Sequence, residues 1–244
     1  MQRDAFALMA QAERDHWWFR ARREFIAAAI RRAAPPAMAR VLDAGCGSGG
    51  NLALLAEFGS VHGFEFDHDA RGVAAALGIG EVAHGSLPDG IPFRDTQFDV
   101  IGLFDVLEHL EHPVPALRAL RGRLAPSAAL VLMVPANPSL WGPHDVAHQH
   151  FRRYTSRSLA DQLQAAGFSI EYLSYFNTLL LPLAVLQRIR ERLFGYSVTS
   201  LTPAPLMNEV LLRIWRLERR WIPSRTLPVG LSLLAIARPA GDRT

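Results

Sequence analysis

A glycine-rich run follows an apolar segment near residue 40. Val41–Gly50 reads VLDAGCGSGG, so a predicted strand passes into a turn that opens a helix. Glycines permit positive φ angles and let the backbone approach a ligand closely, and a helix N-terminus offers free N–H groups. Gly45, Gly47 and Gly50 also fit G-x-G-x-x-G, the fingerprint of dinucleotide-binding proteins. The run therefore predicts a loop that binds a nucleotide-like ligand.

Asp43 favours one class of such ligand over another. Its carboxylate would repel a pyrophosphate, but it would attract a ligand that ends in an ammonium group. S-adenosylmethionine carries that ammonium group and NAD does not. Glu65 lies 22 residues further on, at the end of the next predicted strand, where it can accept hydrogen bonds from both hydroxyls of an adenosine ribose. Asp67 is the alternative for that contact.

Five runs, in this order, resemble class I methyltransferases, particularly those related to ubiquinone-biosynthesis O-methyltransferases. They are LDAGCGSG (42–49), VHGFE (61–65), GSLPDGIPF (85–93), FDVIGLFDVLEHL (98–110) and ALVLMVP (129–135). The resemblance covers roughly residues 13–175. It implies S-adenosylmethionine as methyl donor and S-adenosylhomocysteine as product.

The resemblance also implies which residues contact the cofactor. Ser86 and Leu87 would hold the adenine edge, Leu87 through its backbone, and Phe104 and Asp105 would line the methionine end. Together with the glycine run, the predicted contacts in the body of the chain are Asp43, Gly45, Cys46, Gly47, Glu65, Phe66, Ser86, Leu87, Phe104 and Asp105. Cys46 is interpreted as a small space-filler rather than a nucleophile.

Asp105, Glu108 and His109 stand at i, i+3 and i+4, so if the segment is helical they share one face. The set resembles the acidic-acidic-His group that some quinone-related O-methyltransferases are thought to use for a divalent cation, and its oxygens would suit Mg²⁺. The alternative is that the two acids cap the chain and His109 acts as a base or contacts the substrate. Because two carboxylates and one imidazole are an incomplete ligand set, the sequence allows a cation but does not lead us to expect one.

A histidine-rich loop follows the predicted fifth strand, at the sheet edge where ligands bind in such folds. His144, Asp145, His148, His150 and Tyr154 lie within eleven residues, a dense set of proton-transfer groups. We predict His150 as the first candidate for a general base and His144 as the second, beside His109. Zinc is the weaker interpretation, since no cysteine or firm ligand spacing accompanies the histidines.

Residues 13–23 read ERDHWWFRARR, which resembles the HWWF-x-x-RR entry of a methyltransferase subfamily met beside glycan, lipid and secondary-metabolite genes. The resemblance adds two cofactor contacts. Trp18 would present an aromatic face to the sulfonium, where cation–π attraction helps, and Arg22 would reach the cofactor carboxylate. The alternative is that the tryptophans only pack their helix against the sheet.

Strands that alternate with helices must position all these residues. The periodicity predicts strands at 40–44, 60–66, 81–84, 98–104, 129–134, 169–175 and 231–237, and helices at 3–33 (as two), 51–58, 69–77, 115–124 and 156–166. The expected fold is α/β, with a doubly wound, mostly parallel, seven-stranded Rossmann-like sheet, N-terminal helices and a helical insertion before the last strand.

The insertion is the distinctive segment. We assign 1–175 and 229–238 to a cofactor-binding methyltransferase domain with a helical lid at 1–36, and 176–228 to an apolar, arginine-rich insertion. Residues 176–244 hold 10 Arg against 4 acids, a net charge of +6, whereas 1–175 hold 16 Arg against 19 acids, a net charge of −3. This composition fits contact with a membrane surface or a lipid substrate, and it fits a homodimer interface or ordinary packing as well.

Composition excludes several classes of function. All 26 basic residues are Arg, so a lysine Schiff base and a P-loop lysine are excluded. Cys46 is the only cysteine and cannot form an intrachain disulfide. Without signal-peptide order at the N-terminus, and with Leu179–Leu186 too short to span a bilayer, we predict a cytoplasmic protein, allowing peripheral membrane contact. Nucleic acid is not expected as a partner, because the cofactor-binding part is acidic.

The function predicted from the sequence is O-methylation, dependent on S-adenosylmethionine, of a hydroxyl on a small-molecule, glycan or lipid-linked acceptor. Two alternatives remain at this point. The first is an NAD-dependent Rossmann oxidoreductase, supported by the glycine spacing. The second is a cofactor-binding partner protein without catalysis, which the histidine-rich loop disfavours.

Overall fold

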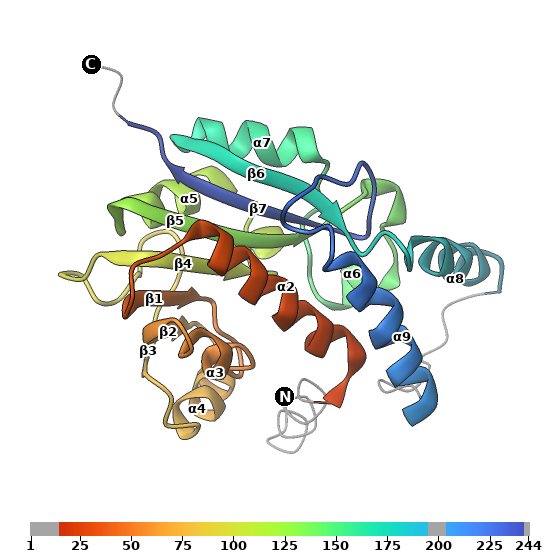
Figure 1. Ribbon diagram of the computed structural model, residues 1–244, viewed down its shortest axis with the longest axis horizontal. Helices are drawn as coiled ribbons and strands as arrows, with labels where there is room; N and C mark the ends of the chain where they lie inside the picture. The colour runs from red at the N-terminus through yellow and green to blue at the C-terminus, as the bar shows by residue number, and fades with distance from the viewer. Residues whose placement is uncertain (1–14, 195–203, 242–244) are drawn as a thin grey trace.

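The computed structural model describes residues 15–194 and 204–241. One seven-stranded sheet has helices on both faces (Figure 1). The strands are β1 (Ala39–Ala44), β2 (Gly59–Glu65), β3 (Glu81–His84), β4 (Phe98–Phe104), β5 (Leu124–Pro135), β6 (Phe168–Phe176) and β7 (Ser232–Pro239). The α-helices are α2 (Trp17–Ala33), α3 (Leu52–Leu55), α4 (His68–Ala76), α5 (Pro113–Arg121), α6 (Pro143–Ala147), α7 (Ser156–Ala165), α8 (Leu181–Phe194) and α9 (Pro205–Glu218), and short 3-10 turns are η1 (Leu107–His109) and η2 (Pro138–Leu140).

The strand order is β3-β2-β1-β4-β5-β7-β6. Strands β1 to β5 are parallel, and β7 runs antiparallel to both β5 and β6. The order reverses between β1 and β4, so the carboxyl ends of these two strands border the crevice in which such sheets bind ligands. This confirms the predicted fold, a doubly wound, mostly parallel sheet with a helical segment before its last strand.

Successive side chains of the central strands enter two separate cores. Val41 of β1 belongs to the core that α2, α3 and α9 cover, whereas its neighbour Leu42 belongs to the core under α5 and α7. This alternation is what a strand that is buried on both faces requires. The sheet is therefore a rigid support for the loops at its carboxyl edge.

Helix α2 is part of the core, and it packs against α9 from the insertion (Figure 1). Trp215 of α9 is fully buried, and its ring lies 5.5 Å from that of Trp17 and 5.6 Å from that of Phe25. The backbone N–H of Trp17 donates to the side chain of Asn208 in α9 (2.8 Å). The N-terminal helix and the insertion thus form one layer over the sheet. The helix predicted before Asp15 lies outside the described residues.

Three predicted boundaries are wrong for tertiary reasons. The helix predicted at 51–58 shortens to α3, because Gly59 must already pair with Ala39 in the β1–β2 ladder. The helix predicted at 115–124 begins at Pro113 and ends at Arg121. The strand predicted at 129–134 begins at Leu124, which pairs with Phe98 of β4. Strand pairing overrode local preference at the end of α3 and at the start of β5.

Helix α8 carries a row of exposed apolar side chains. These are Leu183, Val185, Leu186, Ile189 and Leu193. None of the helices within 15–194 and 204–241 is long and apolar enough to cross a membrane.

Candidate active site

The turn after β1 is held in a conformation that favours glycine. Gly45, Gly47 and Gly49 have φ angles of 76°, 55° and 86°, in the left-handed region. The backbone N–H groups of Gly45 and Cys46 both donate to the carbonyl of Phe64 at 3.0 Å. The turn is thereby tied to the carboxyl end of β2.

Asp43 is buried in β1 just before this turn. Its side chain is 1 % exposed, and its Oδ2 has no hydrogen-bond partner among the described residues. Burial raises the pKa of Asp43 to about 7, against the lowering effect of the Arg22 charge and with a further rise from Glu65. A buried carboxylate without a partner is costly, and a cationic ligand group would offset that cost.

Glu65 ends β2 on the other side of the glycine turn. Its Oε2 accepts from the backbone N–H of Gly47 and its Oε1 from that of Asp67, each at 2.9 Å. Asp67 caps α4, since its Oδ1 accepts from the N–H groups of Asp69 and Ala70. Glu65 is therefore held in place beside the turn, while Asp67 is occupied with capping.

Arg22 of α2 reaches into the site from the helical layer. It is 7 % exposed and forms an ion pair with Asp105. Its guanidinium carbon lies 4.8 Å from the centre of the Trp18 ring, and its Nη2 has no hydrogen-bond partner among the described residues. A buried, always charged group with an unused donor is suited to bind an anion.

Asp105, Glu108 and His109 do not share a helical face, because the segment is not a continuous helix. Asp105 has a φ of 54° and lies outside the helix, and only Leu107–His109 form a 3-10 turn, η1. The left-handed residue reverses the chain after β4, so Asp105 points to Arg22 instead of joining the other two. Asp105 therefore lies outside the group of ligand atoms that Glu108 and His109 form with His150, and the cation set that the sequence allowed does not assemble.

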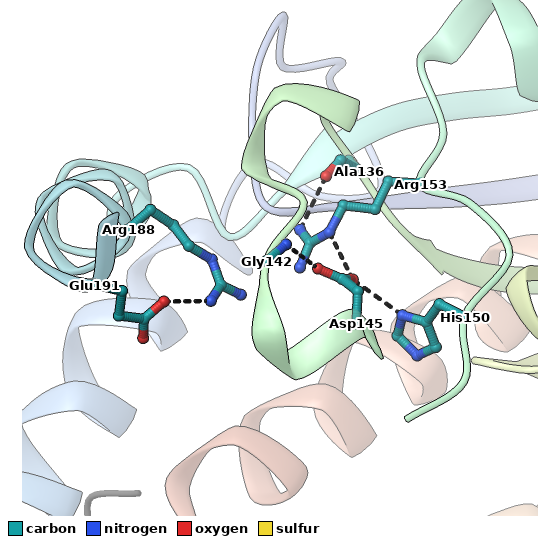
Figure 2. Close-up of polar contacts among 7 residues, drawn as sticks. All are labelled: Ala136, Gly142, Asp145, His150, Arg153, Arg188 and Glu191. Carbon is teal, nitrogen blue, oxygen red and sulfur yellow. Dashed lines mark hydrogen bonds and ion pairs between the residues drawn. The ribbon is translucent and has the colours of Figure 1, made fainter. Parts of the chain in front are cut away.

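Asp145 organises the histidine-rich loop. It is fully buried, and it accepts hydrogen bonds from Nδ1 of His150 (3.0 Å), Nε of Arg153 (2.7 Å) and the backbone N–H of Gly142 (2.9 Å) (Figure 2). Arg153 also donates to the carbonyl of Ala136 (3.2 Å). Burial alone would raise the pKa of Asp145, but the bonds from His150 and Arg153 hold it well below its usual value.

Four imidazoles gather near the carboxyl end of β4. The ring centre of His150 lies 4.7 Å from that of His109, 6.4 Å from that of His144 and 6.0 Å from that of His148. Partial desolvation, with the neighbouring imidazoles, lowers the pKa of His109 to about 4. His109 is therefore neutral at pH 7 and can accept a proton or a Lewis acid.

Glu108 lies beneath this cluster. It is 1 % exposed, and neither carboxylate oxygen has a hydrogen-bond partner among the described residues. Burial, and then the charge of Asp105, raises the pKa of Glu108 well above its usual value. Potential ligand atoms of Glu108, His109 and His150 all lie within 4.8 Å of one another.

The remaining predicted cofactor residues lie at the same edge of the sheet. Phe104 ends β4 and is buried, and Ser86 and Leu87 follow β3 directly. Phe66 follows β2 and is 71 % exposed. Cys46 is buried, which raises the pKa of its thiol and fits its interpretation as a space-filler.

A cleft of about 650 Å³ lies among α2, α3, α4 and α9, and Ser48, Gly49 and Gly50 at the end of the glycine run border it. Its lining includes Arg20, Glu24 and Arg216, but not Asp43 or any histidine of the cluster. We therefore do not regard it as the candidate active site.

Comparisons with known proteins agree with this geometry. A methyltransferase domain matches residues 18–173, which is more than half of the chain. This match decides against the oxidoreductase interpretation of the glycine run. A search of curated protein sequences found no significant match.

Solved structures of methyltransferases share the fold. A putative methyltransferase of Haloferax volcanii, solved in complex with the Trm112 methyltransferase activator, has a TM-score of 0.65 at 16% identity, over 99% of this chain and 97% of that one. A TehB-like SAM-dependent methyltransferase of Corynebacterium glutamicum has a TM-score of 0.55 at 19% identity, over 88% and 87%. The plantazolicin methyltransferase BpumL, in complex with SAH, has a TM-score of 0.61 at 13% identity, over 97% and 90%.

At these identities the solved structures support the fold alone, whereas the match to the methyltransferase domain identifies the family. The two findings agree with each other and with the acidic glycine turn at the reversal of the strand order. The chain therefore belongs to the methyltransferase-domain family, as a class I, S-adenosylmethionine-dependent methyltransferase.

Proposed function

We propose that the protein transfers the methyl group of S-adenosylmethionine to a hydroxyl of a small-molecule, glycan or lipid-linked acceptor. The observation that carries the proposal is the buried carboxylate of Asp43 beside the glycine turn, whose Oδ2 has no hydrogen-bond partner among the described residues. The ammonium group of the cofactor would place a positive charge beside the Asp43 carboxylate and stabilise its ionised form. The resemblance to ubiquinone-biosynthesis O-methyltransferases and to the HWWF-x-x-RR subfamily belongs to the same proposal.

The cofactor would lie along the carboxyl edge from β1 to β3. Each oxygen of Glu65 accepts one backbone N–H and keeps lone-pair capacity for a ribose hydroxyl. Ser86 and the backbone of Leu87 would hold the adenine, with Phe66 beside it. The turn residues Gly45, Cys46 and Gly47 would pass close to the ribose and the amino-acid end.

At the methionine end, Arg22 would bind the cofactor carboxylate with the donor that is unused here. Trp18 would contribute by stacking on Arg22 and thereby holding it in the site. Phe104 and Asp105 would line the space beside the methyl group. Asp105 would remain the counter-ion that keeps Arg22 in place.

Methyl transfer requires little chemistry beyond alignment and a base. The acceptor oxygen attacks the methyl carbon, the C–S bond breaks with its electron pair going to sulfur, and a neutral thioether leaves. The proton of the hydroxyl must pass to a base. His150 is our first candidate, because Asp145 holds its Nδ1 and leaves Nε2 to accept the proton, and His144 and His109 are the others.

Calorimetry and a transfer assay test the proposal. The protein should bind S-adenosylhomocysteine and not NAD(H). It should move a labelled methyl group to an oxygen of one member of a panel of phenolic, glycosyl and polyprenyl-linked acceptors. His150→Ala should lower that turnover about 100-fold and leave the affinity for S-adenosylhomocysteine unchanged. Absence of cofactor binding would refute the proposal, transfer to nitrogen or carbon would refute its O-methylation part, and equal loss of turnover and affinity would make His150 structural.

Among the proposed acceptors, the surface of α8 favours a lipid-linked one, which would bring the protein to a membrane surface. Its exposed apolar row, including Leu186 and Leu193, stands beside the exposed Arg190, a combination that suits an anionic lipid surface. Flotation with anionic liposomes at low salt should carry the protein upward, and Leu186→Glu should abolish that. A protein that stays at the bottom of the gradient rejects the membrane, and a dimer in light scattering that Leu186→Glu converts to a monomer would show that a second copy covers α8.

A further inference from the structure

Three side chains from two distant segments meet beside the methionine end of the site. Glu108 and His109 belong to η1, whereas His150 comes from the loop after β5. The two segments are joined by a hydrogen bond from the N–H of Phe151 to the carbonyl of Glu108 (2.8 Å). Their possible ligand atoms lie within 4.8 Å of one another, so the fold presents one carboxylate and two imidazoles to a common point.

Glu108 has no cation to pair with. Its two oxygens lack hydrogen-bond partners among the described residues, although the side chain is 1 % exposed. Arg22 and Arg153, whose charges act on Glu108, form ion pairs with Asp105 and Asp145 instead. Buried carboxyl groups are normally hydrogen-bonded, paired or bound to a metal ion, and within 15–194 and 204–241 no other side chain supplies such a partner to the oxygens of Glu108.

His150 is oriented as a metal-binding imidazole would be. Its Nδ1 is bound to the fully buried Asp145, which leaves Nε2 free on the opposite side of the ring (Figure 2). A carboxylate behind the ring fixes the tautomer and the orientation of the imidazole, as in carboxylate–histidine–metal groups. Asp145 is itself held by Arg153 and Gly142, so this outer support is rigid.

We propose that Glu108, His109 and His150 form a binding site for a divalent transition-metal ion, represented by Zn²⁺, with Asp145 as the outer support of His150. Two imidazoles and one glutamate are a known ligand set for zinc that keeps a coordination position open. Imidazole nitrogens favour such ions over Mg²⁺, which prefers oxygen. Zinc bonds of about 2.1 Å would draw the ligand atoms to roughly 3.4 Å apart, a contraction that the exposed ring of His109 can accommodate.

The inference deepens the proposed function, on which it rests for its chemical role. The open position would take an oxygen of the acceptor and lower the pKa of its hydroxyl. His150 would then act as a ligand. His144, which lies outside the ligand set with its ring 6.4 Å from that of His150, would receive the proton.

Metal binding is measured on the whole chain after chelation and dialysis. Calorimetry should show one Zn²⁺ per chain, Co²⁺ should give the intense visible absorption of a four-coordinate site, and Mg²⁺ should not bind under the same conditions. Glu108→Gln, His109→Ala and His150→Ala should each lower the Zn²⁺ affinity at least 100-fold, and Asp145→Asn about tenfold. His144→Ala is the matched control and should keep the parent affinity.

Four results would overturn the site: no stoichiometric Zn²⁺ binding, preference for Mg²⁺, unchanged affinity in Glu108→Gln, or equal losses in His144→Ala and His150→Ala. Glu108→Gln should remain folded, because it removes a buried, unpartnered acid. Binding of S-adenosylhomocysteine, measured on the same samples, separates the two hypotheses. Its retention without metal binding refutes the metal site alone, and its absence refutes the proposed function.

Discussion

Asp43 and Asp145 are both buried carboxylates near the carboxyl edge of the sheet, but their surroundings are opposite. Asp43, in β1, leaves one oxygen without a partner, and burial raises its pKa to about 7. Asp145, in the loop after β5, accepts three hydrogen bonds, two of them from His150 and Arg153. These bonds hold its pKa well below its usual value against the effect of burial.

The difference separates two uses of a buried acid. A fully paired carboxylate stabilises the loop in which it lies, and breaking the pair leaves its partners uncompensated. An unpaired one destabilises the free protein and is available to a ligand. Removal of the charge should therefore affect folding at Asp145 and binding at Asp43.

The largest effect should follow the change Asp145→Asn. It leaves the buried Arg153 without its charge partner, which should lower the free energy of unfolding by about 3 kcal/mol. For a chain of 244 residues the melting temperature should fall by about 6 °C, as followed by circular dichroism. An unchanged melting temperature would mean that the paired acid does not support the loop, and the contrast with Asp43 would fail.

Asp43→Asn should produce the reverse pattern. The affinity for S-adenosylhomocysteine should fall about 100-fold, roughly 2.7 kcal/mol, because a buried opposite charge is lost. The melting temperature without ligand should stay the same or rise, since the removed charge had no partner for Oδ2. Calorimetry measures the affinity and thermal melts measure the stability of the same preparation. A variant that is destabilised but still binds S-adenosylhomocysteine would contradict the assignment of Asp43 to binding.

The pH dependence of binding should report the same group. The pKa of Asp43 in the folded protein, about 7, lies above that of an unfolded Asp. The folded state therefore holds an extra proton from about pH 4 to 7, and the contribution of Asp43 to stability declines as pH rises through this window.

An ammonium ligand needs the ionised form of Asp43, so the affinity for S-adenosylhomocysteine should rise about fivefold from pH 6 to 7, reach about tenfold near pH 8 and level off above it. Calorimetry across this range checks it. Asp43→Asn is the control and should flatten the curve, and a slope that survives in the variant would assign the titration to another group.

The smallest effect should come from Glu65→Gln. Its amide keeps one acceptor oxygen, which can serve the N–H of either Gly47 or Asp67, and the other N–H can turn to water at this part-buried to exposed position, so the fold should be preserved. The affinity for S-adenosylhomocysteine should fall about tenfold, or 1.4 kcal/mol, because one charged acceptor for the ribose is lost. Adenine alone, which has no ribose, should bind both forms equally. A loss shared by adenine would show that the turn has been disturbed.

Local patterns in the sequence determined the sheet and the cofactor half of the site. The strand periodicity placed Glu65 at the end of β2, and the glycines after Asp43 predicted the turn that the structure shows. These features depend on residues close together in the chain, where side-chain alternation and backbone freedom act directly.

Tertiary structure alone decided the other half. The Arg22–Asp105 pair, the network around Asp145 and the meeting of Glu108 with His150 join segments that are distant or irregular. Such contacts produce no periodic pattern in the sequence. They depend on the direction in which each loop leaves the sheet and on which charged groups are buried next to one another. The left-handed φ of Asp105 shows this most directly, since one backbone angle after β4 separates a carboxylate from the neighbours with which its spacing had grouped it.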